Sequence, residues 1–115
     1  MADILLIADA IRTIRPTSHY AVKGDGAGGY LVTWEDPDQP EPSAADITAA
    51  MVGAKWERVR DSRNRKLDAC DWTQVTDTAL TDAERDAWQT YRQALRDITT
   101  QADPDAVTWP VEPTP

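Results

Sequence analysis

The sequence has no phenylalanine, one cysteine and one histidine. A single cysteine, Cys70, excludes an internal disulfide and a cysteine-based zinc site. A zinc site needs three or four ligands, so His19 alone does not supply one, and we interpret it as a surface or strand-edge histidine. The sequence also shows no catalytic constellation. We therefore expect no metal, no cofactor and no enzymatic activity.

Positive charge and long apolar runs are scarce as well. The chain has 12 Lys and Arg residues against 20 Asp and Glu residues, a formal net charge of −8. Binding to a phosphate backbone depends on Lys and Arg, so this acidic chain is a poor candidate for nucleic-acid binding. No run approaches the roughly 20 apolar residues of a membrane span, and Asp3 and Asp9 bracket a short apolar run that does not resemble a signal peptide. These absences favour a cytosolic protein that binds neither nucleic acid nor membrane.

Residues 1–42 predict a small head made of a helix and a β-hairpin, followed by a linker. The expected elements are a helix over Asp3–Ile14, strands over His19–Lys23 and Tyr30–Glu35, and a proline-rich linker over Asp36–Pro42. Gly24–Gly29 separates the strands. A phosphate-binding loop would need a helix after its glycines, whereas a strand follows here, so we interpret the glycines as a hairpin turn.

Residues 43–100 predict an antiparallel α-helical hairpin, and residues 101–115 an extended tail ending in a Trp-Pro segment. The expected elements are a helix from Ser43 to about Cys70, a connection over Asp71–Leu80, and a helix from Thr81 to about Thr99–Gln101. Each helix opens with a capping box, Ser43 with Asp46 and Thr81 with Glu84. The fold class is therefore α+β: a head, a proline-rich linker and a helical hairpin with a tail.

Two charge patterns allow both a functional and a structural interpretation. Arg58–Lys66 is a basic stretch that suits an acidic partner or a nucleic acid. It also suits pairing with the acidic third helix, and pairing of Asp61 with Arg65 within its own helix. Carboxylate pairs such as Asp82 and Asp86 give no pocket from which to infer acid–base catalysis, so they favour a solvated face.

Aromatic residues of the C-terminal half form the most informative pattern. Trp72 lies in the expected connection, Trp88 and Tyr91 lie on the apolar stripe of the last helix, and Trp109 lies in the tail. The rings of Trp72 and Trp109 suit a structural role in which they pin irregular segments onto the helices. Alternatively, Trp72, Tyr91 or Trp109 faces a partner, because Trp, Tyr and Arg dominate binding hot spots.

Two arginines lie one turn apart on the same helix. Arg92 and Arg96 are each placed to bind Asp71 or Asp77 in the connection through a charge-assisted hydrogen bond. Such a bond would fix the connection against the last helix.

These spacings resemble a known family. The residues concerned are Arg63, Leu67, Asp71, Trp72, Thr73, Gln74, Asp77, Trp88, Tyr91, Arg92, Leu95, Arg96, Asp97, Ile98, Trp109, Pro110 and Pro113. Together, over about Arg58–Pro113, they resemble the tail assembly chaperone proteins of tailed bacteriophages, which include small tail-fibre assembly proteins. The sequence departs from the family pattern at Val75 and Thr76, where a Leu-Pro pair is expected, and at Thr99, where a proline is common. Both departures lie in connections, so they bear on partner specificity more than on fold.

The resemblance implies a non-enzymatic protein of phage tail morphogenesis that binds a tail or tail-fibre protein as an assembly chaperone in the host cytoplasm. The expected partner-binding or hairpin-shaping residues are Asp71, Trp72, Trp88, Tyr91, Arg92, Arg96, Asp97 and Trp109. An alternative is that the same module remains in the virion as a structural component of the tail tip or fibre junction. Self-association is a further option, and an acidic inhibitor of nucleic-acid enzymes has only the net charge in its favour.

Overall fold

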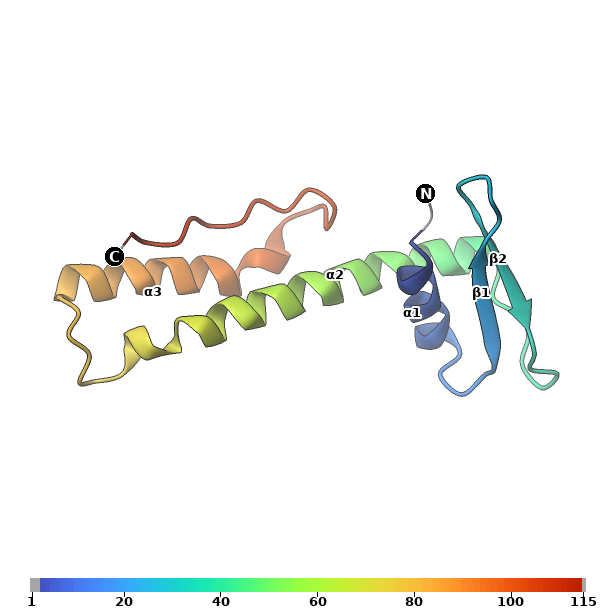
Figure 1. Cartoon of the computed structure of the whole chain (residues 1–115), viewed down its shortest axis with the longest axis horizontal. Coiled ribbons are helices and arrows are strands. Elements are labelled where there is room, and N and C mark those ends of the chain that lie inside the picture. The colour runs from blue at the N-terminus through green and yellow to red at the C-terminus, as the bar shows by residue number, and fades with distance from the viewer. Residues whose placement is uncertain (1–2, 115) are drawn as a thin grey trace. The chain divides into compact units, whose positions relative to one another are not determined.

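The computed structural model describes residues 3–114, which fall into two compact units, Met1–Lys55 and Trp56–Pro115 (Figure 1). In chain order the elements are α1 (Ile4–Ile14), β1 (Tyr20–Gly24), β2 (Tyr30–Trp34), α2 (Ala44–Ala69), the 3-10 helix η1 (Asp71–Gln74), α3 (Asp82–Arg96) and the 3-10 helix η2 (Ile98–Thr100). The α+β class is confirmed. The division at residues 42 and 100 stays a prediction, and residues 1, 2 and 115 of its outer segments lie outside the described part.

Local signals set the elements of the first unit. The Asp3 side chain accepts a hydrogen bond from the Leu6 backbone N–H at 3.0 Å and so caps α1, which ends at Ile14, just before Pro16. The antiparallel strands pair Tyr20 with Trp34. The expected start of β2 at Tyr30 is confirmed. The other three bounds were one residue off, since β1 begins at Tyr20 and ends at Gly24, and β2 ends at Trp34.

The hairpin turn depends on glycine and on one aspartate. Gly26 and Gly28 have φ angles of 82° and 89°, in the left-handed region that favours glycine. Asp25 Oδ1 accepts hydrogen bonds from the backbone N–H groups of Ala27 and Gly29, at 2.8 and 2.9 Å. The glycine-rich stretch is therefore a hairpin turn, as expected.

One small core holds the first unit together. Its buried members are Ile7, Ala10 and Ile11 of α1 and Ile47 of α2. One face of the hairpin packs against them, so the two-stranded sheet, which would be marginal alone in water, gains a covering helix. Trp34 closes the edge of this core, because its ring stacks on Tyr20 and its indole N–H donates to Gln39 O at 2.9 Å.

Capping also sets where α2 and α3 begin. Ser43 and Asp46 bond each other's backbone N–H groups at the start of α2, and Thr81 and Glu84 form a full capping box at the start of α3. The expected end of α3 at Thr99–Gln101 was wrong. The helix ends at Arg96, and the chain tightens into η2, where Thr100 bonds the carbonyl of Asp97.

The core of the second unit lies along one face of α3. Trp88, Tyr91 and Leu95 are buried there with Cys70, and Leu67, Leu80 and Trp109 pack against them. Trp109 belongs to the C-terminal segment that follows η2 and runs beside α3 (Figure 1). Segments from α2, the connection and the tail therefore share the apolar stripe of one helix. No helix within residues 3–114 has the length and apolar character needed to cross a membrane.

Candidate protein-binding surface

Arg92 joins three segments of the second unit. Its side chain, only 12% exposed, extends from α3 and donates through Nη1 to Leu67 O at 2.9 Å and to Cys70 Sγ at 3.2 Å. Its Nη2 lies 2.9 Å from Asp71 Oδ1, so the predicted bond between Arg92 and Asp71 is confirmed. Leu67 lies in the last turn of α2, where a cation interacts favourably with the outward carbonyls and the helix dipole.

The environment of Arg92 keeps it charged. Burial lowers the pKa of the guanidinium, but the hydrogen bonds that Arg92 donates to Cys70 and Asp71 outweigh burial, so the pKa lies above its ordinary value. Its Nε is the one buried side-chain nitrogen or oxygen without a partner among residues 3–114. The net stabilisation from Arg92 is therefore less than its three contacts suggest, because an unpaired buried donor carries a desolvation cost.

Thr73 anchors the 3-10 helix η1. Thr73 is fully buried and its hydroxyl donates to Cys70 O at 2.7 Å. The preceding residue, Trp72, is 54% exposed. The short Asp71–Gln74 helix thus presents a large aromatic ring on a fixed backbone.

Three rings extend from this exposed position into the core. Trp72 meets Trp88 edge-on, with ring centroids 6.1 Å apart, and Trp88 meets Tyr91 edge-on at 5.7 Å. Both Trp88 and Tyr91 are buried. Edge-to-face pairs at these distances are favourable, so the exposed ring is supported by the two below it.

Burial affects the chemistry of Tyr91. It raises the pKa of the phenol, and the negative charge of Glu112 raises it further. Tyr91 is therefore neutral at physiological pH and serves as a packing residue with a polar tip.

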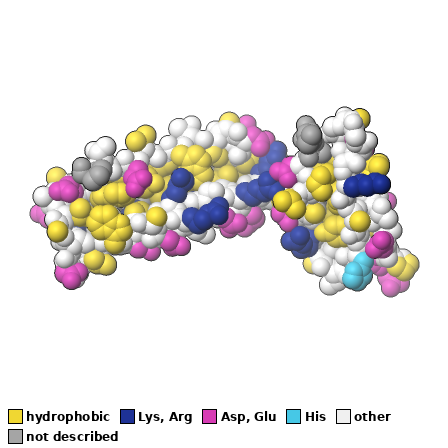
Figure 2. Space-filling view, in the orientation of Figure 1, with side chains coloured by type: hydrophobic (Ala, Val, Ile, Leu, Met, Phe, Trp, Pro, Cys, Tyr) yellow, Lys and Arg dark blue, Asp and Glu magenta, His cyan; other side chains and the backbone are white. Residues whose placement is uncertain are grey.

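A groove opens beside the exposed ring. It has a volume of about 440 Å³ and is lined by Trp72, Leu80, Glu84, Trp88, Glu112, Pro113 and Thr114. In the view of Figure 2, hydrophobic side chains gather over the α3 side of the second unit, with acidic side chains at the margin. The lining of the groove thus combines apolar residues with two acidic residues, Glu84 and Glu112.

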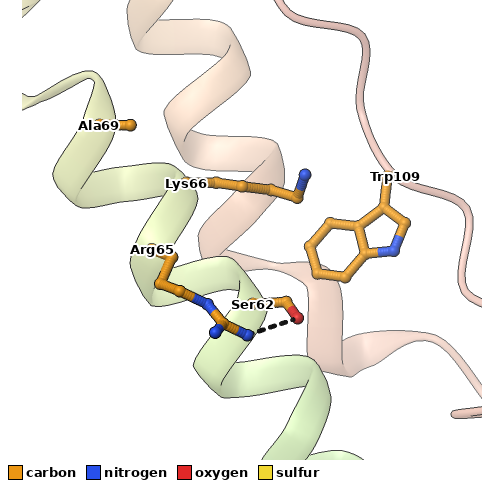
Figure 3. Close-up of a pocket in the computed structure, with 5 residues that line it drawn as sticks. All are labelled: Ser62, Arg65, Lys66, Ala69 and Trp109. Carbon is orange, nitrogen blue, oxygen red and sulfur yellow. Dashed lines mark hydrogen bonds between the residues drawn. The ribbon is translucent and has the colours of Figure 1, made fainter.

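A second, more open pocket of about 390 Å³ has the opposite charge. It is lined by Ser62, Arg65, Lys66, Ala69 and Trp109 (Figure 3). Lys66 extends toward the Trp109 ring, with its Nζ 5.1 Å from the ring centroid, which is a cation–π contact. Arg65 bonds Ser62 at 3.4 Å. Trp109 is thereby held between the apolar core and a basic helix face.

Most of the sequence-predicted residues lie together. Asp71, Trp72, Trp88, Tyr91, Arg92 and Trp109 belong to the interconnected core and turn described above. Arg96 and Asp97 are exposed instead and bond Gln93 on α3, so they do not join this set. Whether any of the eight binds a partner stays a prediction.

Part of the groove lining could not be recognised from the sequence. Glu84 was assigned only a capping role, and Leu80, Glu112 and Thr114 were given none. Exposed carboxylates are common in this chain, and nothing local in the sequence distinguishes Glu84 and Glu112 from the others.

Within residues 3–114, no group of three or more His, Cys, Asp or Glu residues is placed to hold a metal ion.

The fold and these surfaces define a small α+β protein whose second unit is a helical hairpin fixed by tryptophans and by Arg92, whose side chain is 12% exposed. Residues 56–114 match the family described as phage tail assembly chaperone protein, and the chain belongs to that family. The match covers almost all of the second compact unit, Trp56–Pro115.

Among solved structures, the chain is similar to the solution structure of protein CV0426 from Chromobacterium violaceum. The two are 34% identical, the similarity covers 75% of this chain and 90% of that one, and the TM-score is 0.46. No curated protein matches the sequence significantly. The chaperone family suggests a role in phage tail assembly that does not involve catalysis.

Proposed function

We propose that this protein binds a tail or tail-fibre protein in the cytoplasm of the infected host and covers part of its surface until that protein enters the tail. The match of residues 56–114 to the tail assembly chaperone family carries this proposal. Binding is the activity, and no bond is made or broken.

The geometry of the second unit supports a binding role. Trp72 is large, half-exposed and held by Trp88, which is how an aromatic anchor at an interface is usually presented. The turn that carries it is fixed by Thr73 and by the bond between Arg92 and Asp71. A partner therefore meets a pre-organised surface, which limits the entropy lost on binding.

Co-expression tests this function. Each tail and tail-fibre protein of the same phage is produced in a bacterial host with the chain, and with an unrelated acidic protein of similar size as the control. We expect at least one tail protein to become more soluble and to co-elute with the chain in size-exclusion chromatography. If every tail protein behaves alike with the chain and with the control, the proposed function is wrong.

Mass spectrometry of purified virions separates the chaperone from the structural alternative. A chaperone that leaves before completion is absent from the virion. Stoichiometric amounts in the virion would instead identify a structural component of the tail tip or fibre junction.

A further inference from the structure

We infer that the groove beside Trp72 is the client-binding site, and that it takes a polypeptide segment in which an apolar side chain is flanked by Lys or Arg. This inference rests on the proposed function and adds the position of the contact and the chemistry of the client. The groove is lined by the connection, by the first half of α3 and by Glu112–Thr114 of the tail.

Three large side chains of the groove lining are apolar. They are Trp72, Leu80 and Trp88, and the first of these is 54% exposed. A volume of about 440 Å³ is within the range of sites that enclose a small ligand, so it accommodates an apolar side chain with its neighbours. Filling the groove would remove from water a tryptophan face that the chain itself leaves uncovered.

The negative charge around the groove favours a client segment that carries Lys or Arg. Asp71–Glu84 contains four acidic residues and no Lys or Arg. Two of these acids have arginine partners, since Arg92 bonds Asp71 at 2.9 Å and Arg85 lies 3.8 Å from Asp82. The groove itself is lined by one acid of this stretch, Glu84, and by Glu112 of the tail.

The partners of Glu84 leave its charge in place. Its Oε1 accepts hydrogen bonds from the backbone N–H and the hydroxyl of Thr81, which are both neutral groups. Glu112 is exposed, and its field acts on Tyr91. A Lys or Arg on the client would complement both carboxylates, whereas an acidic segment would be repelled.

Peptide titration of the full chain tests whether the groove prefers an apolar side chain flanked by basic residues. The probes are Gly-Lys-Leu-Lys-Gly, its acidic counterpart Gly-Glu-Leu-Glu-Gly, and Gly-Lys-Ser-Lys-Gly, which lacks the apolar side chain. Binding is followed by NMR through the indole N–H signals of the ¹⁵N-labelled tryptophans. We expect the first peptide to shift the signals of Trp72 and Trp88, and each of the others to bind about tenfold more weakly. Equal shifts from all three peptides, no shift from the first, or shifts confined to Trp109 would overturn the inference.

Variants with matched controls test whether the peptide binds in this groove. Glu84→Gln removes one charge but keeps the capping box, since glutamine also serves there. Glu112→Gln removes the other, and Asp86→Asn is the control that removes a charge from α3 outside the groove lining. We expect each groove variant to weaken binding of the first peptide about threefold, and the control to leave it unchanged. Equal losses in all three would show general electrostatic attraction and overturn the inference.

The co-expression assay then separates failure of the site from failure of the function. Trp72→Ala is compared with Leu5→Ala, which truncates a 74% exposed side chain of the first unit. We expect the client to lose solubility and co-elution with Trp72→Ala only, with both variants folded by circular dichroism. If the wild-type chain solubilises a client and Trp72→Ala does so equally, the function stands and the site is wrong. If Trp72→Ala instead dissociates a dimer seen by sedimentation, the occupant is a second copy of this chain.

Discussion

Replacing Arg92 by methionine removes the guanidinium but keeps most of the apolar stem. The variant loses the bond to Leu67 O at 2.9 Å, the contact with Cys70 Sγ and the ion pair with Asp71. A hydrogen bond to a charged group contributes about 1.5–3 kcal/mol. The ion pair adds less than about 1 kcal/mol, because the Asp71 side chain is 60% exposed and well solvated.

Two effects reduce the loss. Arg92 Nε is buried without a partner, so its removal ends a desolvation cost. Leu67 O still accepts the backbone N–H of Cys70 at 3.1 Å, so no carbonyl is left unpaired. We therefore expect Arg92→Met to lower the free energy of unfolding by about 2 kcal/mol. With a urea slope of about 2 kcal/mol per M, the midpoint falls by about 1 M.

The assay is urea unfolding of the full chain followed by tryptophan fluorescence. Arg96→Met is the matched control, since Arg96 lies one turn along α3, is exposed and bonds only Gln93 among the interactions described. Its cost should stay below about 0.5 kcal/mol. Asp71→Asn should cost less than about 1 kcal/mol, and much less once Arg92 is already methionine. The reasoning is refuted if Arg92→Met lowers the free energy of unfolding by less than about 0.5 kcal/mol, or if both arginine variants lower it equally. Arg92 would then not hold the three segments of this unit together.

Three further predictions concern the same unit. Thr81→Ala removes the N-cap of α3 and should cost about 1 kcal/mol in urea unfolding, whereas Thr81→Ser should cost much less. Leu95→Ala opens a cavity at a fully buried side chain and should cost about 2–5 kcal/mol, against almost nothing for the exposed Leu5→Ala; equal effects would contradict this core. Tyr91 has a raised pKa in the folded state, so its stabilising effect is present below the ordinary tyrosine pKa of about 10 and is lost as the pH rises through the folded value. Stability above about pH 10 should therefore fall more steeply for the wild type than for Tyr91→Phe, and parallel curves would contradict the shift.

Local signals in the sequence predicted most of the helices. The caps at Asp3, Ser43 and Thr81 act over three residues, so their partners can be read directly from the chain. The apolar stripe of the last helix placed Trp88 and Tyr91 on one face, and both are buried in the structure together with Leu95. The same stripe reaches Ile98, which is buried too, but in a 3-10 turn that the apolar spacing does not distinguish from a continuing α-helix.

Contacts between distant residues were harder to predict. Arg92 and Arg96 were equivalent candidates for bonding Asp71, and only the folded arrangement shows that Arg92 faces the end of α2 while Arg96 is exposed. The groove brings Glu112 beside Trp72, which is forty residues earlier in the sequence. No periodicity or capping rule connects such positions, because they meet only when the tail folds back on α3.

Site-specific photo-crosslinking tests the assignment of client binding to the second unit most directly. Benzoylphenylalanine replaces either Trp72 or Leu31, which are similarly exposed at 54% and 51% but belong to different units. Each full-length variant is co-expressed with the tail protein that the wild-type chain solubilises, and is then irradiated. We predict a covalent adduct with the tail protein from position 72 and none from position 31. An adduct from position 31 and none from position 72 would contradict the proposal.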